Sequence, residues 1–272
     1  MLYCSPLAVD SQSGPCYTDL AGGFTRFPFS TKPIYLMEPL RVQSLKDACI
    51  QRLEGLILSG EWQMGMRLPS ERDLAAELNI SRPVLHEALV DLETKGLVSI
   101  AARRGVFVSD YRSSGSCALL SSLLSYHGGR LDPAFIQSML GMRLLVETET
   151  ARLAATNRSQ EHLAQFEQIL QSEMTIARDQ AELTGLDFSF HLLTAIASGN
   201  LVYPLILNSF KSVYTHLTGR FFEAYGQTAV VDEVFRLHHR LAEAISAQDG
   251  PGAAAVMAEM LRHGERYLQE IL

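Results

Sequence analysis

Cysteine is scarce in this sequence, and long apolar runs are missing from it. The four cysteines are scattered without a CxxC pair, so we expect neither a disulfide framework nor a cysteine zinc site. No apolar run approaches the roughly 20 residues that a membrane helix needs. The N-terminus also lacks a basic segment followed by an apolar core. We therefore expect a cytoplasmic protein without a membrane partner.

Positive charge is not in excess either. The net charge of −7 argues against general affinity for nucleic acid, because lysine and arginine supply most phosphate contacts. Residues 39–110 carry nine cationic and ten anionic side chains, a net charge of −1. Whether this segment can bind nucleic acid therefore depends on where its cations lie. Several arginines fall at predicted helix starts or in a turn, where they could converge on phosphates: Arg72, Arg82, Arg103 and Arg104.

The composition that is present, with 47% hydrophobic and 19% charged residues, suits one large or two ordinary globular domains. Residues 1–38 hold prolines and glycines without a sustained period, and we interpret them as a flexible leader. We expect a first domain over residues 39–110, a linker over 111–116 and a second domain over 117–272.

Two capped amphipathic helices are predicted between Leu68 and Val98. Ser70 is placed to cap the first, and Ser81 the second, with Pro83 in the first turn of the second helix. Two helices about a short turn form a helix-turn-helix, which can enter a DNA major groove, although short helical hairpins are also common in all-α folds. Their apolar positions recur at helical spacing: Leu74, Ala75, Leu78, Val84, Leu85, Ala88, Leu89 and Leu92.

A short alternating pattern follows these helices. Leu97–Ile100 and Val106–Val108 are predicted strands on either side of a tight turn at Arg103–Gly105. Such a hairpin can act as a wing whose turn lies along the DNA backbone or in a minor groove. The wing therefore favours DNA binding over an ordinary helical hairpin.

Three stretches of this region resemble a known family. GEWQMGMRLPSERDLAAEL, SRPVLHEALVDLETKGLV and RRGVFV are similar, in continuous order over about residues 40–110, to the winged helix-turn-helix domain of GntR-family bacterial transcription regulators. His86 departs from the family, which usually has arginine there. A neutral imidazole cannot make the bidentate contact of arginine to guanine. The resemblance implies DNA contacts at Arg72, Ser81, Arg82, His86, Arg104 and Gly105.

The second half has no credible strand, and we predict an antiparallel all-α bundle. The fold class is therefore mainly α, with an N-terminal winged helix-turn-helix. Start signals such as Asp132-Pro133 and Ser159 and a stop signal at Gly199 delimit the helices. The expected helical segments are 117–126, 133–156, 160–181, 183–198, 201–225, 228–248 and 252–271.

A carboxylate and several imidazoles in the bundle have spacing that suits a metal. Asp187 and His191 are four residues apart and share a helix face, while His238 and His263 fall on or beside the apolar stripes of later helices. Such ligands suit a divalent ion of the zinc, nickel or manganese type. The ordinary alternative is that each histidine is a hydrogen-bonded core residue.

The bundle also resembles the effector-binding domain of the FadR-like branch, known as FCD, through MRLLVETETARLAA, DFSFH…ASGN and HHRLAEAISAQD…MLRHGERYL. Many members hold a metal with one Asp and three His. The resemblance implies ligands at Asp187, His191, His238 and His263. Two choices stay open: His239 could replace His238, and a register without gaps puts Met260 at the fourth position.

Arg143 and Glu147 interrupt an apolar stripe. Buried charges are costly unless paired, so a mutual ion pair is one interpretation. The other is that Arg143 binds the carboxylate of a small organic acid beside the metal, as its position in the resembled family implies. His216 and Arg220, four residues apart, are further candidates for effector binding.

From these patterns we expect a homodimeric transcription regulator rather than an enzyme. It would act as a repressor on a near-palindromic operator and respond to a carboxylate bound with the metal. The alternative is a metal-dependent hydrolase or lyase that uses the Asp/His cluster, but no evident general base lies beside those ligands. A third hypothesis is an acyl ligand bound without metal.

Overall fold

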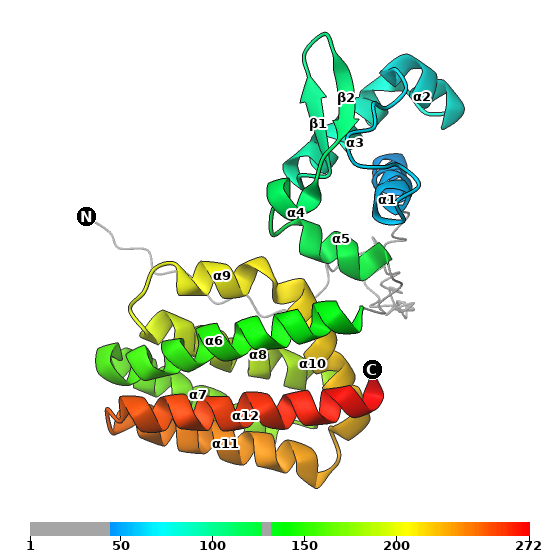
Figure 1. The fold of residues 1–272 in the computed structure, drawn as a ribbon. Helices are drawn as coiled ribbons and strands as arrows, with labels where there is room; N and C mark the ends of the chain where they lie inside the picture. Colours follow the sequence, from blue (N-terminus) through cyan, green and yellow to red (C-terminus); the bar gives the residue numbers. More distant parts are fainter. Residues whose placement is uncertain (1–43, 127–131) are drawn as a thin grey trace, which may run out of the picture. The chain divides into compact units, whose positions relative to one another are not determined.

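The computed structural model describes residues 44–126 and 132–272, so the predicted leader at 1–38 lies outside the described residues. The described chain begins with a winged helix-turn-helix (Figure 1). Its elements follow the predicted order, and the mainly α fold class is confirmed. They are α1 (Leu45–Leu58), α2 (Glu71–Glu77), α3 (Arg82–Thr94), β1 (Val98–Ala101) and β2 (Gly105–Val108).

Side-chain caps start the helices of this region where the sequence indicates. The hydroxyl oxygens of Ser70 and Ser81 accept hydrogen bonds from the backbone N–H groups of Asp73 and Val84. Each cap satisfies one of the amide groups that a helix N-terminus leaves without a partner. Asn79 adopts a positive φ of 53° between the two helices, which turns the chain from one helix into the next.

The wing is an antiparallel hairpin in which Val98 pairs with Val108 and Ala101 with Gly105. Gly105 adopts a φ of 108°, and a Cβ there would lie 3.1 Å from the Arg67 side chain, so the turn needs glycine. The valines of both strands join the core of the DNA-binding region with the apolar faces of its helices. That core includes Leu53, Leu74, Leu85, Leu89, Leu92, Leu97 and Val106.

The expected linker contains a helical turn. Residues 111–114 form α4 (Tyr111–Ser114), because the Asp110 carboxylate accepts from the backbone N–H of Arg112 and caps it. The next helix, α5 (Leu119–Tyr126), packs against the winged region through Leu119. Ser122 of α5 donates to the buried Glu54 carboxylate at 2.7 Å, and Lys95 donates to the same oxygen at 2.6 Å. Buried Glu54 is therefore paired and hydrogen-bonded.

The rest of the described chain is helical, as predicted, and α6 and α12 run side by side through it (Figure 1). Two expected segments differ in length. The segment predicted over 160–181 ends at Thr175, and the one over 201–225 is divided near Phe210, which has non-helical dihedrals. The helices are α6 (Pro133–Asn157), α7 (Gln160–Thr175), α8 (Gln180–Ala197), α9 (Tyr203–Ser209), α10 (Lys211–Tyr225), α11 (Ala229–Ser246) and α12 (Gly250–Ile271).

Two apolar clusters fill the helical domain. One centres on the aromatic residues Phe188, Tyr214 and Phe222, and the other on Phe166 and Phe190 with small alanines of α6. Burial of this apolar area is the main favourable term in folding of the bundle. Within residues 44–126 and 132–272, no helix is long and apolar enough to cross a membrane.

Candidate functional site

Three of the predicted metal ligands meet in the interior of the helical domain. Asp187 and His191 come from α8, and His238 comes from α11. One ligand atom from each lies within 4.8 Å of the other two. The Nε2 atoms of His191 and His238 are 4.0 Å and 3.8 Å from Oδ1 of Asp187. The spacing of four residues along α8 therefore brings both of its side chains to one point, as expected.

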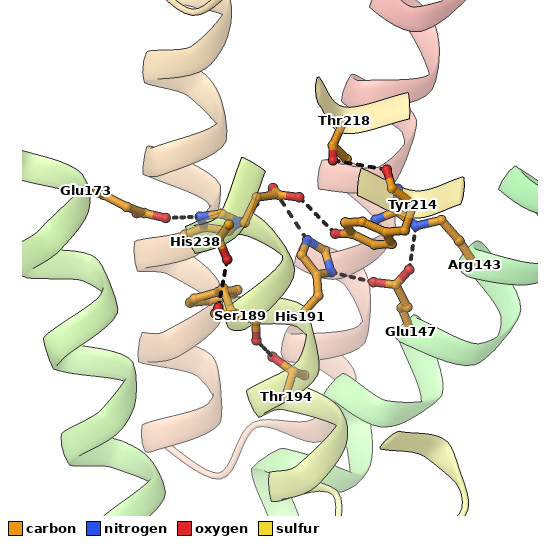
Figure 2. Close-up of polar contacts among 12 residues, drawn as sticks. Arg143, Glu147, Glu173, Ser189, His191, Thr194, Tyr214, Thr218 and His238 are labelled. Atoms are coloured by element: carbon orange, nitrogen blue, oxygen red, sulfur yellow. Dashed lines mark hydrogen bonds and ion pairs between the residues drawn. The ribbon is translucent and has the colours of Figure 1, made fainter. Parts of the chain in front are cut away.

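A buried glutamate contacts each imidazole on the side away from Asp187 (Figure 2). Glu147 of α6 contacts Nδ1 of His191, and Glu173 of α7 lies 2.6 Å from Nδ1 of His238. A carboxylate only accepts, so each Nδ1 carries the hydrogen and each Nε2 is directed at Asp187. In the described chain, Nε2 of His238 is buried without a hydrogen-bond partner. Because a buried polar atom is costly unless it is paired, this nitrogen is available to a bound group.

Glu147 also holds the arginine of the predicted pocket. Nε of Arg143 donates to Oε1 of Glu147 at 2.6 Å, and both side chains are buried, so the predicted ion pair is confirmed. Burial alone would raise the pKa of Glu147, but the charges of Arg143 and His191 outweigh it and lower the pKa to about 2. Glu147 therefore remains ionised between two cationic or hydrogen-bonding partners.

Tyr214 of α10 connects Arg143 with the ligands. Its hydroxyl donates to Oδ2 of Asp187 at 2.9 Å, and the Arg143 guanidinium lies 4.0 Å from the centre of its ring. Burial raises the pKa of Tyr214 well above the ordinary value, so the phenol stays protonated and remains a donor. The second oxygen of Asp187 is thus fixed, while Oδ1 faces the two imidazoles.

A small cavity of about 40 Å³ opens beside these side chains. Arg143, Asp187, His191 and Met260 line it together with apolar residues of α10 and α12. Met260, the residue that the sequence left open as an alternative fourth ligand, is therefore on the side of α12 that lines this cavity. His238, rather than His239, completes the cluster from α11.

The structure does not bring His263 to the cluster, so that assignment is corrected. Its Nε2 lies 2.9 Å from the carbonyl oxygen of Val230, and its ring packs against Tyr267 and Phe221. α12 runs unbroken from Gly250 to Ile271, and Met260 is one of its buried residues.

His216 and Arg220 also lie apart from the cavity around Asp187. They line a separate surface pocket with Gln180 and Glu223. The reason is helical spacing. Thr218 and Phe222 of α10 line the cavity, and His216 and Arg220, two residues before and after Thr218, lie on another face of the helix. Their prediction as effector contacts is not supported at this cavity.

Two polar residues of the site were missed from the sequence, Glu173 and Tyr214. Glu173 follows Phe166 and Leu170 on the buried face of α7, so an acid on an apolar stripe was the available signal. Tyr214 lies among Val213 and Leu217 in the same way. Neither pattern identifies the histidine or carboxylate that the residue meets, because the partner is on another helix.

The predicted DNA-contacting residues lie on the outside of the winged region. Arg72, Ser81, Arg82, His86 and Arg104 are exposed, and Gly105 is half-buried at the wing turn. Leu85, Ala88, Leu89 and Leu92 face inward, so one face of α3 is left for an external partner. This arrangement of a capped second helix and a basic turn suits a major groove and an adjacent backbone.

Both parts of the chain match known families. Residues 45–108 match the family described as bacterial regulatory proteins of the gntR family, and residues 138–263 match the FCD domain. The chain belongs to the GntR family. This GntR regulator is 29% identical over 238 residues to the HTH-type transcriptional regulator Mce2R of Mycobacterium tuberculosis. The matched region covers 87% of this chain and 96% of the relative.

Other relatives agree with this assignment. The HTH-type transcriptional repressor NanR of Klebsiella aerogenes is 32% identical over 61% of this chain and 63% of the relative. A solved structure described as "Lar controls the expression of the Listeria monocytogenes agr system and mediates virulence" has a TM-score of 0.57 at 16% identity. It covers 85% of this chain and 100% of that chain, and supports the fold alone. The matched families and relatives are transcription regulators. The prediction of a transcription regulator is therefore confirmed, and the alternative of a hydrolase or lyase is not.

Proposed function

We propose that this GntR regulator is a homodimeric, cytoplasmic repressor that binds a near-palindromic operator. A small organic acid, bound with a divalent metal in the FCD domain, controls that binding. Two copies of the winged region would place two α3 helices on successive half-sites, which is why the operator would be near-palindromic. The name of the NanR relative, a transcriptional repressor, supports the sign of regulation.

The observation that supports a metal most directly is the pair of imidazole Nε2 atoms aimed at one carboxylate oxygen, with Nε2 of His238 left without a partner. Asp187, His191 and His238 would hold the ion, and two imidazoles with a carboxylate suit zinc, nickel or manganese. Glu147 and Glu173 fix the tautomer and orientation of the two rings. When bound, the metal supplies a positive centre that attracts an anionic effector.

The cavity supports an acid as the effector. Arg143 lines it and uses Nε for Glu147, so its terminal nitrogens are the donors suited to a carboxylate. The thioether of Met260, which lines the cavity, is a weaker donor than a third histidine would be, and so leaves the ion more positions for the acid or water. Because the cavity measures only about 40 Å³, binding of an organic acid requires the lining side chains or the helices that carry them to move. Such movement couples the ligand to a change of state.

The test is a thermal-shift screen of small organic acids on the full chain, with and without zinc, nickel and manganese salts. A ligand that binds the native state raises the apparent melting temperature. We expect acids to stabilise the protein more in the presence of one of the ions than without it. Stabilisation by fatty acids that is independent of metal would instead favour the acyl-ligand hypothesis.

Metal binding should weaken in acid. Burial lowers the pKa of His238, but the Glu173 carboxylate at 2.6 Å outweighs it and raises the pKa above the usual 6.5. The protonated imidazole is therefore favoured until the pH exceeds this raised value, and the ion must displace its proton. Below that value we expect affinity to fall about tenfold for each pH unit and each proton displaced.

Titration of zinc into metal-free protein across about pH 6 to 8 measures this dependence. Glu173→Gln provides the control, because a neutral amide no longer stabilises the imidazolium. In this variant the fall in affinity should begin at a lower pH. An affinity that does not vary over the range would argue against His238 as a ligand.

A further inference from the structure

His86 lies on the exposed face of α3, and one side of its imidazole ring contacts a carboxylate. Its Nδ1 is 3.2 Å from Oε1 of Glu71, the first residue of α2. The side chain of His86 is 54% exposed and that of Glu71 is 28% exposed. The imidazole therefore projects from the outer face of α3 while one of its nitrogens is occupied.

This contact determines what the other nitrogen can do. A carboxylate oxygen accepts hydrogen bonds and has none to give, so the hydrogen of the neutral ring sits on Nδ1. Nε2 then carries a lone pair and is the acceptor that this half-exposed ring can offer to an outside partner. An arginine at the same place would present donors only.

We propose that Glu71 fixes His86 as a hydrogen-bond acceptor toward DNA, so that this chain reads an amino-bearing base, cytosine or adenine, at this position. In the major groove, cytosine offers its N4 amino group and adenine its N6 amino group, whereas guanine and thymine offer acceptor oxygens or nitrogens there. An acceptor nitrogen therefore meets a complementary edge on cytosine or adenine and an unfavourable one on guanine. The inference rests on the DNA-binding function proposed above for the outer face of α3.

Arg82 lies next to His86 on this face and offers hydrogen-bond donors, whereas His86 offers an acceptor. It lies four residues before His86, one helical turn away on the same exposed face. Arginine is a donor suited to guanine O6 and N7. Side by side, the two residues would read a guanine and an amino-bearing base on adjacent parts of the half-site.

The experiment is selection of binding sites from a random duplex library by the full-length protein, followed by affinity measurements on the selected operator and its single-base variants. For the wild type we expect cytosine or adenine at one symmetric position of the half-site. Guanine or thymine there should weaken binding about tenfold, the effect of one hydrogen bond and an unpaired group. His86→Arg should change the selected base to guanine.

Glu71→Gln tests the role of the carboxylate. The amide can accept from or donate to Nδ1, so the tautomer is no longer fixed and the preference should fall to about twofold or less. Glu77→Gln on the same helix is the matched control. Glu77 is exposed and does not contact His86, and its substitution removes the same charge. The variant should therefore bind DNA more tightly overall, with the base preference unchanged.

The outcomes separate this inference from the function on which it rests. If the wild type enriches no sequence, or if Arg82→Ala keeps full affinity and specificity, the proposal that the outer face of α3 contacts DNA is wrong. If the wild type enriches an operator and Arg82→Ala weakens it, but Glu71→Gln retains the same preference as Glu77→Gln, the inference about Glu71 is overturned. The selection of guanine by the wild type at the position that His86→Arg alters would overturn it as well.

Discussion

Replacement of Arg143 by methionine is expected to destabilise the helical domain by about 3 to 5 kcal/mol at neutral pH. Methionine keeps the apolar stem but removes the guanidinium that donates to Glu147 at 2.6 Å and lies over Tyr214. The Glu147 carboxylate would then remain buried with one partner, His191. Breaking one side of a buried pair is more costly than replacing the pair, because a buried charge is left without compensation.

Urea denaturation of the full chain measures this loss, followed by far-ultraviolet circular dichroism, to which the helical domain contributes most. Trp62 is the single tryptophan and lies in the winged region, so its fluorescence reports a domain that should keep its stability. The double variant Arg143→Met/Glu147→Gln should recover most of the loss, since no buried charge remains. A loss below about 1 kcal/mol would contradict the pairing.

The same loss should shrink in acid. The pKa of Glu147 is lowered to about 2, so the stability that its partners provide is fully present above pH 4.5 and is lost as the pH falls toward 2. Stability curves of wild type and Arg143→Met should therefore converge below pH 4.5. Parallel curves across that interval would show that the cost of the substitution arises from lost packing alone.

Replacement of Asp187 by asparagine is expected to lower the affinity for a divalent ion by more than about 100-fold. This is a larger loss than removal of a residue that only hydrogen-bonds to a metal ligand would cause. The amide oxygen is neutral and coordinates more weakly than a carboxylate. It can still accept from Tyr214, which lies 2.9 Å from Asp187, so the fold should be kept. Zinc titration with circular dichroism measures both properties.

Glu182→Gln is the matched control for this change. Glu182 is an exposed acid on the same helix, α8, and lies outside the ligand cluster. Its substitution removes the same charge from the same helix and should leave the affinity within about twofold of wild type, because exposed charges act weakly through water. Equal zinc affinity in Asp187→Asn and Glu182→Gln would exclude Asp187 as a ligand.

Local patterns in the sequence predicted the winged region well. Ser70, Ser81 and Gly105 act on the residues next to them, so their capping and turn roles are visible in the chain itself. Boundaries were less accurate where a local feature was weak. Asp110 caps a helical turn at Tyr111–Ser114 that a serine- and glycine-containing stretch did not suggest.

The site was predicted only as far as helical spacing extends. Asp187 and His191 share one helix, so their proximity follows from the sequence. The partners of His191 and His238 are Glu147 and Glu173, which come from two other helices. Their contacts depend on how the helices pack, and the same packing places Met260 rather than His263 toward the cavity.

Control of DNA binding through the metal site is tested by operator affinity in the presence of an effector. The acid that stabilises the zinc-loaded protein most in the thermal-shift screen would be added to wild type and to Asp187→Asn on the selected operator. We predict that the acid lowers operator affinity of the wild type at least about tenfold, a coupling of about 1.4 kcal/mol. It should have no effect on Asp187→Asn. Unchanged operator affinity in the wild type, or an equal response in the variant, would contradict control of DNA binding through this site.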